Sequence, residues 1–82
     1  MNIGQLVNMA NQIGSFFASM PDRQEAMKGI AEHIRKFWEP RMRRELLALL
    51  GDHPQGNAEG VSLDPLVLQA IEQYRAELVP RR

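Results

Sequence analysis

The side chains of this chain that could take part in chemistry are few, and their spacing does not suit a reaction centre. His33 and His53 are too far apart to form a pair of metal ligands on one helix, and neither has further ligands at a suitable spacing. We interpret His33 as a partly exposed helix residue and His53 as a loop residue. Asp22 and Glu25 have the spacing of a helix capping box, which explains them better than acid–base catalysis does. The sequence therefore predicts a chain that is not an enzyme by itself and has no catalytic, cofactor-binding or metal-binding residues.

Composition excludes several further classes of site. The sequence contains no cysteine, which excludes a disulfide, a thiolate zinc site and a cysteine-ligated iron–sulfur cluster. Its formal net charge of +0 gives no overall attraction to nucleic acid or to anionic lipid. Residues 1–20 lack the basic start and the cleavage site of a signal peptide, and they are too polar to cross a bilayer. We expect a cytoplasmic protein that does not bind a membrane.

The first 20 residues carry no charge at all. Apolar side chains recur there at helical spacing, and the opposite face has only amides and hydroxyls, among them Asn8, Gln12 and Ser15. A helix that only had to stay soluble would normally carry Lys, Glu or Arg on that face. Amides and hydroxyls suit a surface that loses its water on assembly, because no charge has to be buried. The sequence predicts that Asn8, Gln12 and Ser15 contact a partner protein.

Two pairs of adjacent aromatic residues lie in predicted helices: Phe16 with Phe17, and Phe37 with Trp38. Neighbouring residues point about 100° apart on a helix, so both members of a pair rarely face the same core. We expect Phe17 and Phe37 in the core, and Phe16 and Trp38 at its rim, where they would anchor a partner. A small domain could also bury both members of a pair.

Basic side chains gather around the turn at Pro40. Three of them lie at the start of a predicted helix, where the helix dipole disfavours cations by roughly 0.3 kcal/mol or more each: Arg41, Arg43 and Arg44. This position suggests contact with an acidic surface of a partner protein. Two alternatives remain. One is a solvated face, whose charge Glu39 and Glu45 offset locally, and the other is a small helical nucleic-acid-binding module that uses the basic turn at residues 35–44.

The elements that position these residues are predicted to be helices, in an all-α fold with a single small four-helix domain over residues 1–82. The turn residues and the apolar spacing place them at about 2–20, 22–38, 40–50 and 64–78, with a Gly-rich loop at 51–61 and a frayed tail at 79–82. Pro21 ends the first helix, and Pro40 ends the second and begins the third. Gly51 is expected to cap the third helix, and Pro65 to begin the fourth. A core of this size gives only about 3–5 kcal/mol, so such a chain often relies on a partner.

Several short strings, in this order and spacing, resemble the delta subunit of NAD-dependent, molybdenum-containing formate dehydrogenase. The resemblance covers nearly the whole chain apart from the loop after the third helix, and it departs at Glu39, where the family pattern has Asp before the proline. The matching strings are Met9-Ala10-Asn11-Gln12-Ile13-Gly14, Phe16-Phe17, Ser19-Met20-Pro21-Asp22-Arg23, Ile30-Ala31 with His33, Arg35-Lys36-Phe37-Trp38, Pro40-Arg41-Met42-Arg43, Leu46-Leu47 and Leu63 to Val67.

This resemblance implies an accessory subunit of a larger enzyme. In the family, an alpha subunit holds a molybdenum bis-guanine-dinucleotide centre and iron–sulfur clusters, and beta and gamma subunits carry FMN, the NAD site and further clusters. The complex oxidises formate to carbon dioxide in the cytoplasm, with NAD as acceptor. The delta subunit would bind no cofactor itself and would support assembly, cofactor status or integrity of the complex. The residues expected to contact the alpha subunit are Asn8, Gln12, Ser15, Phe16, Trp38, Arg41, Arg43 and Arg44.

Overall fold

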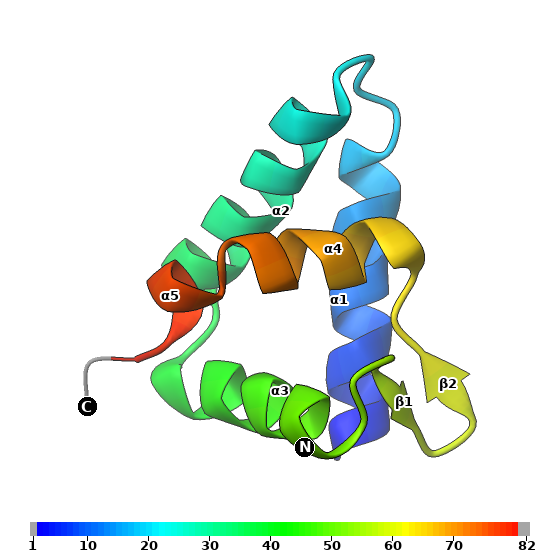
Figure 1. Ribbon diagram of the computed structural model, residues 1–82, viewed down its shortest axis with the longest axis vertical. Coiled ribbons are helices and arrows are strands. Elements are labelled where there is room, and N and C mark those ends of the chain that lie inside the picture. Colours follow the sequence, from blue (N-terminus) through cyan, green and yellow to red (C-terminus); the bar gives the residue numbers. More distant parts are fainter. Residues whose placement is uncertain (1, 81–82) are drawn as a thin grey trace.

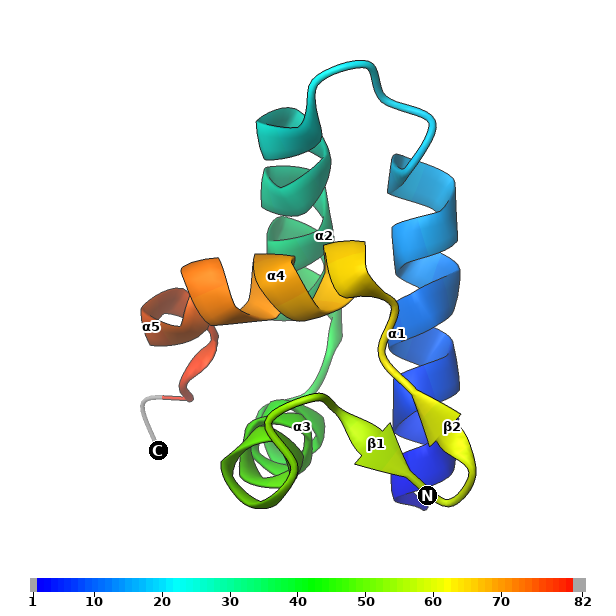
Figure 2. The ribbon, with the colours of Figure 1, turned by 45° about the vertical axis from the view of Figure 1, so that its right-hand side comes forward.

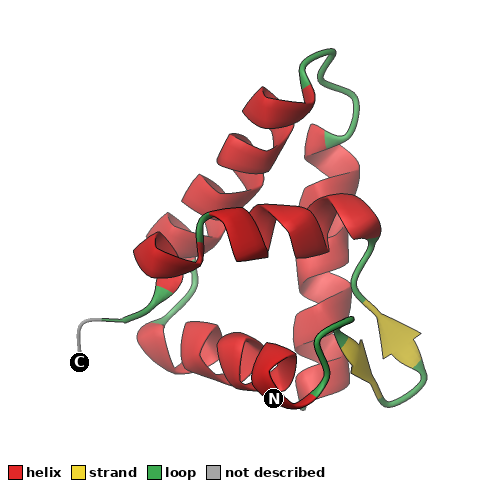
Figure 3. Cartoon of the chain, in the orientation of Figure 1, coloured by secondary structure: helices red, strands yellow, loops and turns green. Residues whose placement is uncertain are grey.

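Helices make up most of residues 2–80, the part of the chain that this computed structural model describes (Figure 3), and the prediction of a mainly helical fold is confirmed. The elements in chain order are α1 (Ile3–Phe17), α2 (Arg23–Phe37), α3 (Pro40–Asp52), β1 (Asn57–Ala58), β2 (Val61–Ser62), α4 (Pro65–Gln73) and α5 (Arg75–Leu78). Met1 and the last two residues of the predicted tail, Arg81 and Arg82, lie outside the described residues.

The helices begin where polar caps or prolines allow them to begin. The Asp22 carboxylate accepts hydrogen bonds from the backbone N–H groups of Gln24 (2.8 Å) and Glu25 (3.4 Å) at the start of α2. The prolines at positions 40 and 65 are the first residues of α3 and α4, as predicted. At the start of α1, Asn2 and Gln5 form a reciprocal capping box that the sequence analysis missed.

Two predicted helix ends are wrong. The first helix ends at Phe17 rather than at residue 20, and the turn formed by residues 18–22 is longer than expected. The third helix continues through Gly51 to Asp52, so Gly51 does not cap it. A glycine cap requires a left-handed backbone, and the chain adopts that conformation later, at Gly56 (φ 74°) and Gly60 (φ 83°).

The C-terminal half also differs from the prediction. The loop expected at 51–61 contains a short antiparallel hairpin in which Asn57 pairs with Ser62 and Ala58 with Val61. The fourth predicted helix is divided at Tyr74 (φ −106°, ψ 21°) into α4 and α5. The hairpin forms part of the connection between α3 and α4, and the break at Tyr74 lets α5 turn toward the end of α2 (Figure 1).

The helices form a triangular frame around one core (Figure 1). Helices α1 and α2 run antiparallel, lie closest at the 18–22 turn and diverge below it, where α3 closes the open end. Helix α4 crosses in front of both, and Figure 2 shows it bridging them. At the α1–α4 crossing, Gly14 faces Val67 so closely that a Cβ on Gly14 would overlap the valine side chain. The centre of the frame is filled by fully buried side chains, among them Leu6, Met27, Ile30, Ile34, Leu46, Val67 and Ile71.

Polar side chains connect α4 and the hairpin to the first two helices. The side-chain amide of Asn11 in α1 donates to the Ser62 carbonyl oxygen (2.9 Å) and accepts from the Asp64 backbone N–H (2.9 Å). Arg23 of α2 donates to the Gln69 side chain of α4, with a shortest distance of 2.6 Å. These bonds join residues 46 to 53 positions apart, so they set the place of α4 across the α1–α2 pair.

Candidate protein-docking surfaces

The face of α1 that points away from the core is polar and carries no charge. Asn8, Gln12 and Ser15 are all exposed on it, together with Gln5. The three residues recur at spacings of four and three, so they form one stripe along the helix. Their exposure agrees with the prediction, and contact with a partner stays a prediction.

The first aromatic pair is arranged as predicted, and the second is reversed. Phe16 is 75% exposed, whereas Phe17 is half-buried and packs against the core. The predicted positions of Phe37 and Trp38 are wrong: Phe37 is 71% exposed, and Trp38 is only 6% exposed and belongs to the core. Trp38 therefore does not offer its ring to a partner, and the exposed aromatic at this corner is Phe37.

The reversal follows the helical spacing of α2. Helix α2 ends at Phe37, and Trp38 is its C-cap (φ −86°, ψ 137°), whose backbone N–H still donates to the Ile34 carbonyl oxygen (3.0 Å). Trp38 therefore continues the buried side of α2 after Ile34 at four-residue spacing, and Phe37 continues the more exposed side after His33. The indole then fills the corner between α2 and α3, where Pro40 begins the next helix.

The basic residues around this corner have different surroundings. Arg41 is 82% exposed and forms an ion pair with Glu45 one turn later (3.5 Å). Arg44 is exposed, and Arg43 is half-buried with its Nε atom covered and without a hydrogen-bond partner. An exposed ion pair of the Arg41–Glu45 kind contributes little to stability, about 0.3–0.5 kcal/mol. Arg41 is thus available to a partner at little energetic cost.

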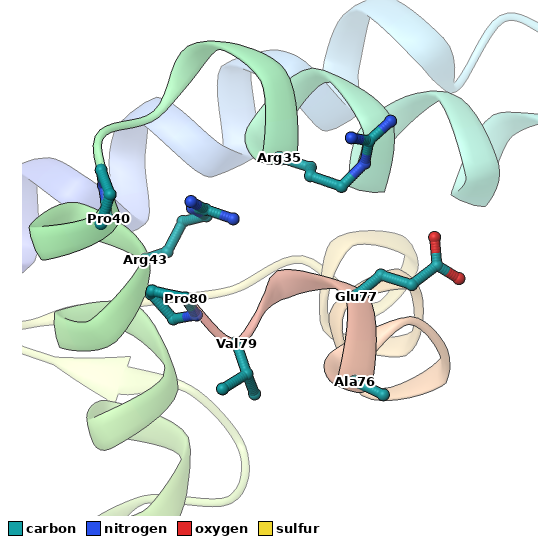
Figure 4. Close-up of a pocket in the computed structure, with 7 residues that line it drawn as sticks. All are labelled: Arg35, Pro40, Arg43, Ala76, Glu77, Val79 and Pro80. Carbon is teal, nitrogen blue, oxygen red and sulfur yellow. The ribbon is translucent and has the colours of Figure 1, made fainter. Parts of the chain in front are cut away.

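A shallow pocket lies between this corner and α5 (Figure 4). Arg35 of α2, Arg43 of α3 and Glu77 of α5 surround it, and Val79 and Pro80 form its floor beside α3. The mixture of cations, one carboxylate and apolar atoms does not favour a particular ligand. The pocket is best explained as the junction of three helix ends.

The burial of Trp38 weakens the alternative that the basic turn at residues 35–44 binds nucleic acid. Such binding needs an exposed aromatic ring beside the basic turn, on which a base could stack. Trp38 is buried and cannot serve. Phe37 is the aromatic ring that remains exposed there.

Within residues 2–80, no group of three or more His, Cys, Asp or Glu side chains is arranged to hold a metal ion. His33 is partly exposed on α2, as predicted, and its ring lies 4.8 Å from that of Phe37. His53 is exposed and is the C-cap of α3. In the same residues, no helix combines the length and the apolar character that a membrane span requires.

Sequence reasoning missed two features that shape these surfaces. Asn11 looks like one more amide of the uncharged α1 helix, yet its side chain is committed to the backbone at Ser62 and Asp64. Asn11 lies three residues after Asn8 and four before Ser15, so helical spacing places it beside the exposed stripe and does not distinguish it. Gly29 of α2 lies under the ring of Phe17, and no local signal in the sequence indicates that contact.

Comparison with known proteins identifies a family. Residues 5–71 match the family described as the NADH-dependent formate dehydrogenase delta subunit, FdsD. No curated protein and no solved structure matches the chain. The match extends from the first turn of α1 into α4, and it includes the stripe on α1 and the basic corner. This chain belongs to the family of NADH-dependent formate dehydrogenase delta subunits.

Proposed function

We propose that this chain is a non-catalytic accessory subunit of a cytoplasmic, NAD-dependent formate dehydrogenase. It binds the large, molybdenum-containing alpha subunit and through it associates with the beta and gamma subunits. Its role is to support assembly, cofactor status or integrity of the complex. The observation that carries this proposal, together with family membership, is the uncharged exposed stripe on α1 formed by Asn8, Gln12 and Ser15.

The chemistry of the stripe favours a surface that is covered by protein. A buried ion without a partner is costly, and a buried amide needs only hydrogen-bond partners, which a protein surface supplies. The described residues of α1 include no charged residue, whereas α2 and α3 both carry several. The contrast between α1 and its neighbours marks one side of the molecule as suited to burial.

The basic corner supplies a second, electrostatic part of the contact. Arg41 is well exposed, and Arg44 is exposed on the same helix. Exposed cations at the rim of an interface raise the rate of association with an acidic surface more than they raise affinity. Formate oxidation itself belongs to groups on other subunits: the molybdenum bis-guanine-dinucleotide centre, iron–sulfur clusters, FMN and NAD. This chain has no cysteine with which to ligate such a cluster.

The test uses the whole complex. The tagged alpha subunit is expressed with its beta and gamma partners, with and without this chain, and both co-purification and formate-dependent NAD reduction are measured. We expect the wild-type chain to co-purify, and its omission to lower the yield of active complex. Gln12→Lys and Ser15→Lys should weaken co-purification because each places a charge in the covered surface. Gln55→Lys, an exposed amide in the loop after α3, is the matched control. Unchanged association of both stripe variants would contradict the docking role of α1.

A further inference from the structure

Four aromatic rings and one glycine form a continuous strip across the α1–α2 pair, here called the aromatic seam: Phe16, Phe17, Gly29, His33 and Phe37. The ring of Phe16 meets that of Phe17 edge to face, with 5.1 Å between the centroids. The ring of Phe17 then lies over Gly29 of the neighbouring helix, where a Cβ would approach its Cε1 atom to 2.5 Å. Gly29, His33 and Phe37 follow one another at four-residue spacing, so they share one side of α2.

The two ends of the seam are the most exposed large apolar side chains of the described residues. Phe16 is 75% exposed at one end, and Phe37 is 71% exposed at the other, against the His33 ring. The middle of the seam is half-buried, because Phe17 and His33 are partly covered. Exposed phenylalanine rings at both ends contribute little to the core, and aromatic residues in such positions are enriched at protein–protein interfaces.

The charge along the seam is uneven. At the Phe16 end, the side chains that α1 itself contributes are uncharged. Around Phe37 the last turn of α2 carries Arg35 and Lys36, both exposed, and Glu39 follows after the helix end. Lys28 and Glu32 flank the middle of the seam with opposite charges, so the surface that complements the seam is apolar opposite the rings and acidic at the Phe37 end.

We propose that the aromatic seam is the anchor by which this chain binds another subunit of the formate dehydrogenase, through an apolar segment with an acidic group at one end. This inference rests on the proposed function and adds the site and the chemistry of its occupant. Family membership supplies the partner, because a delta subunit is one chain of a larger enzyme.

The test measures binding of the purified chain to the formate dehydrogenase complex prepared without it. Phe16→Gln and Phe37→Gln remove an exposed ring at each end, and each should raise Kd about tenfold or more, the usual effect of losing an anchor residue. Val79→Gln is the matched control, because Val79 is 52% exposed and lies outside the seam, and its Kd should stay within about twofold. Circular dichroism and urea unfolding confirm that the variants are folded. Lys36→Glu should also weaken binding, and the loss should diminish at high salt.

The outcomes separate the inference from the proposed function. If the wild-type chain binds but both phenylalanine variants bind equally well, the seam is not the anchor, and the proposed function stands. If the wild-type chain does not bind the complex at all, both proposals fail. If the isolated chain is a dimer that Phe37→Gln converts to a monomer, the occupant is a second copy and the inference is wrong.

Discussion

Trp38 and Phe37 are adjacent in the sequence, and the structure gives them opposite roles that mutation can separate. Trp38 is 6% exposed in the core, and Phe37 is 71% exposed on the surface. A buried tryptophan removes up to about 250 Å² from water. At about 25 cal/mol per Å², this burial corresponds to at most about 6 kcal/mol. Measured costs of replacing a core aromatic by alanine are about 3–5 kcal/mol.

A core of this size provides only about 3–5 kcal/mol of net stability, so Trp38→Ala should leave the isolated chain largely unfolded. Trp38→Phe keeps a ring in the corner between α2 and α3, and we expect it to fold with a loss of about 1–3 kcal/mol. Phe37→Ala removes a side chain that the core does not use, and its cost should stay near 0.5 kcal/mol, roughly the limit for surface substitutions.

Urea unfolding followed by far-UV circular dichroism gives the free energy of unfolding of all three variants under the same conditions. Trp38 is the single tryptophan, so fluorescence of the wild-type protein gives an independent check: its emission should shift to longer wavelength on unfolding. A stable Trp38→Ala variant beside an unstable Phe37→Ala variant would refute the placement of the two rings. The placement would also be refuted if Trp38 in the native protein emitted at the same wavelength as in the unfolded chain.

Three further substitutions test the packing of the helices, each by urea unfolding of the isolated chain. Asn11→Ala removes two hydrogen bonds of 2.9 Å to the backbone around β2 and should cost about 1–3 kcal/mol; wild-type stability would contradict the link. Gly14→Ala places a Cβ against Val67 and should cost about 1–3 kcal/mol, and Val67→Ala in the same chain should recover part of that loss. Gly51→Ala faces open space in α3 and should stabilise by about 0.5–1 kcal/mol; a loss would mean that the helix does not continue through this position.

The sequence was informative where local chemistry decides the structure. The Asp22 cap and the prolines that begin α3 and α4 depend on neighbouring residues alone, and those starts were predicted correctly. Gly51 was misread because the signal for a glycine cap requires a left-handed backbone, which the chain uses at Gly56 instead.

Contacts between distant segments could not be predicted in the same way. The exchange of Phe37 and Trp38 is different, because the four-residue spacing of Ile30, Ile34 and Trp38 already indicates that Trp38 is the buried member of the pair. The aromatic seam depends on Phe17 meeting Gly29 of another helix. Of the candidate site, the exposure of the α1 stripe and of Phe16 followed from helical spacing, and the same spacing applied to Ile34 and Trp38 would have identified Phe37 as the second exposed ring.

The crossing of α4 over α1 has a consequence during synthesis on the ribosome. Helix α1 is made first, yet Gly14 is covered by Val67 only when α4 has left the ribosome. The 54 residues from Ala18 through Ile71 take roughly 3 to 11 s to synthesise at 5–20 residues per second. Throughout that interval α2 and α3 can already pack against α1, while the part of α1 around Gly14 that α4 covers stays open. A chaperone or partner subunit can therefore reach this part of α1 before the chain's own α4 does.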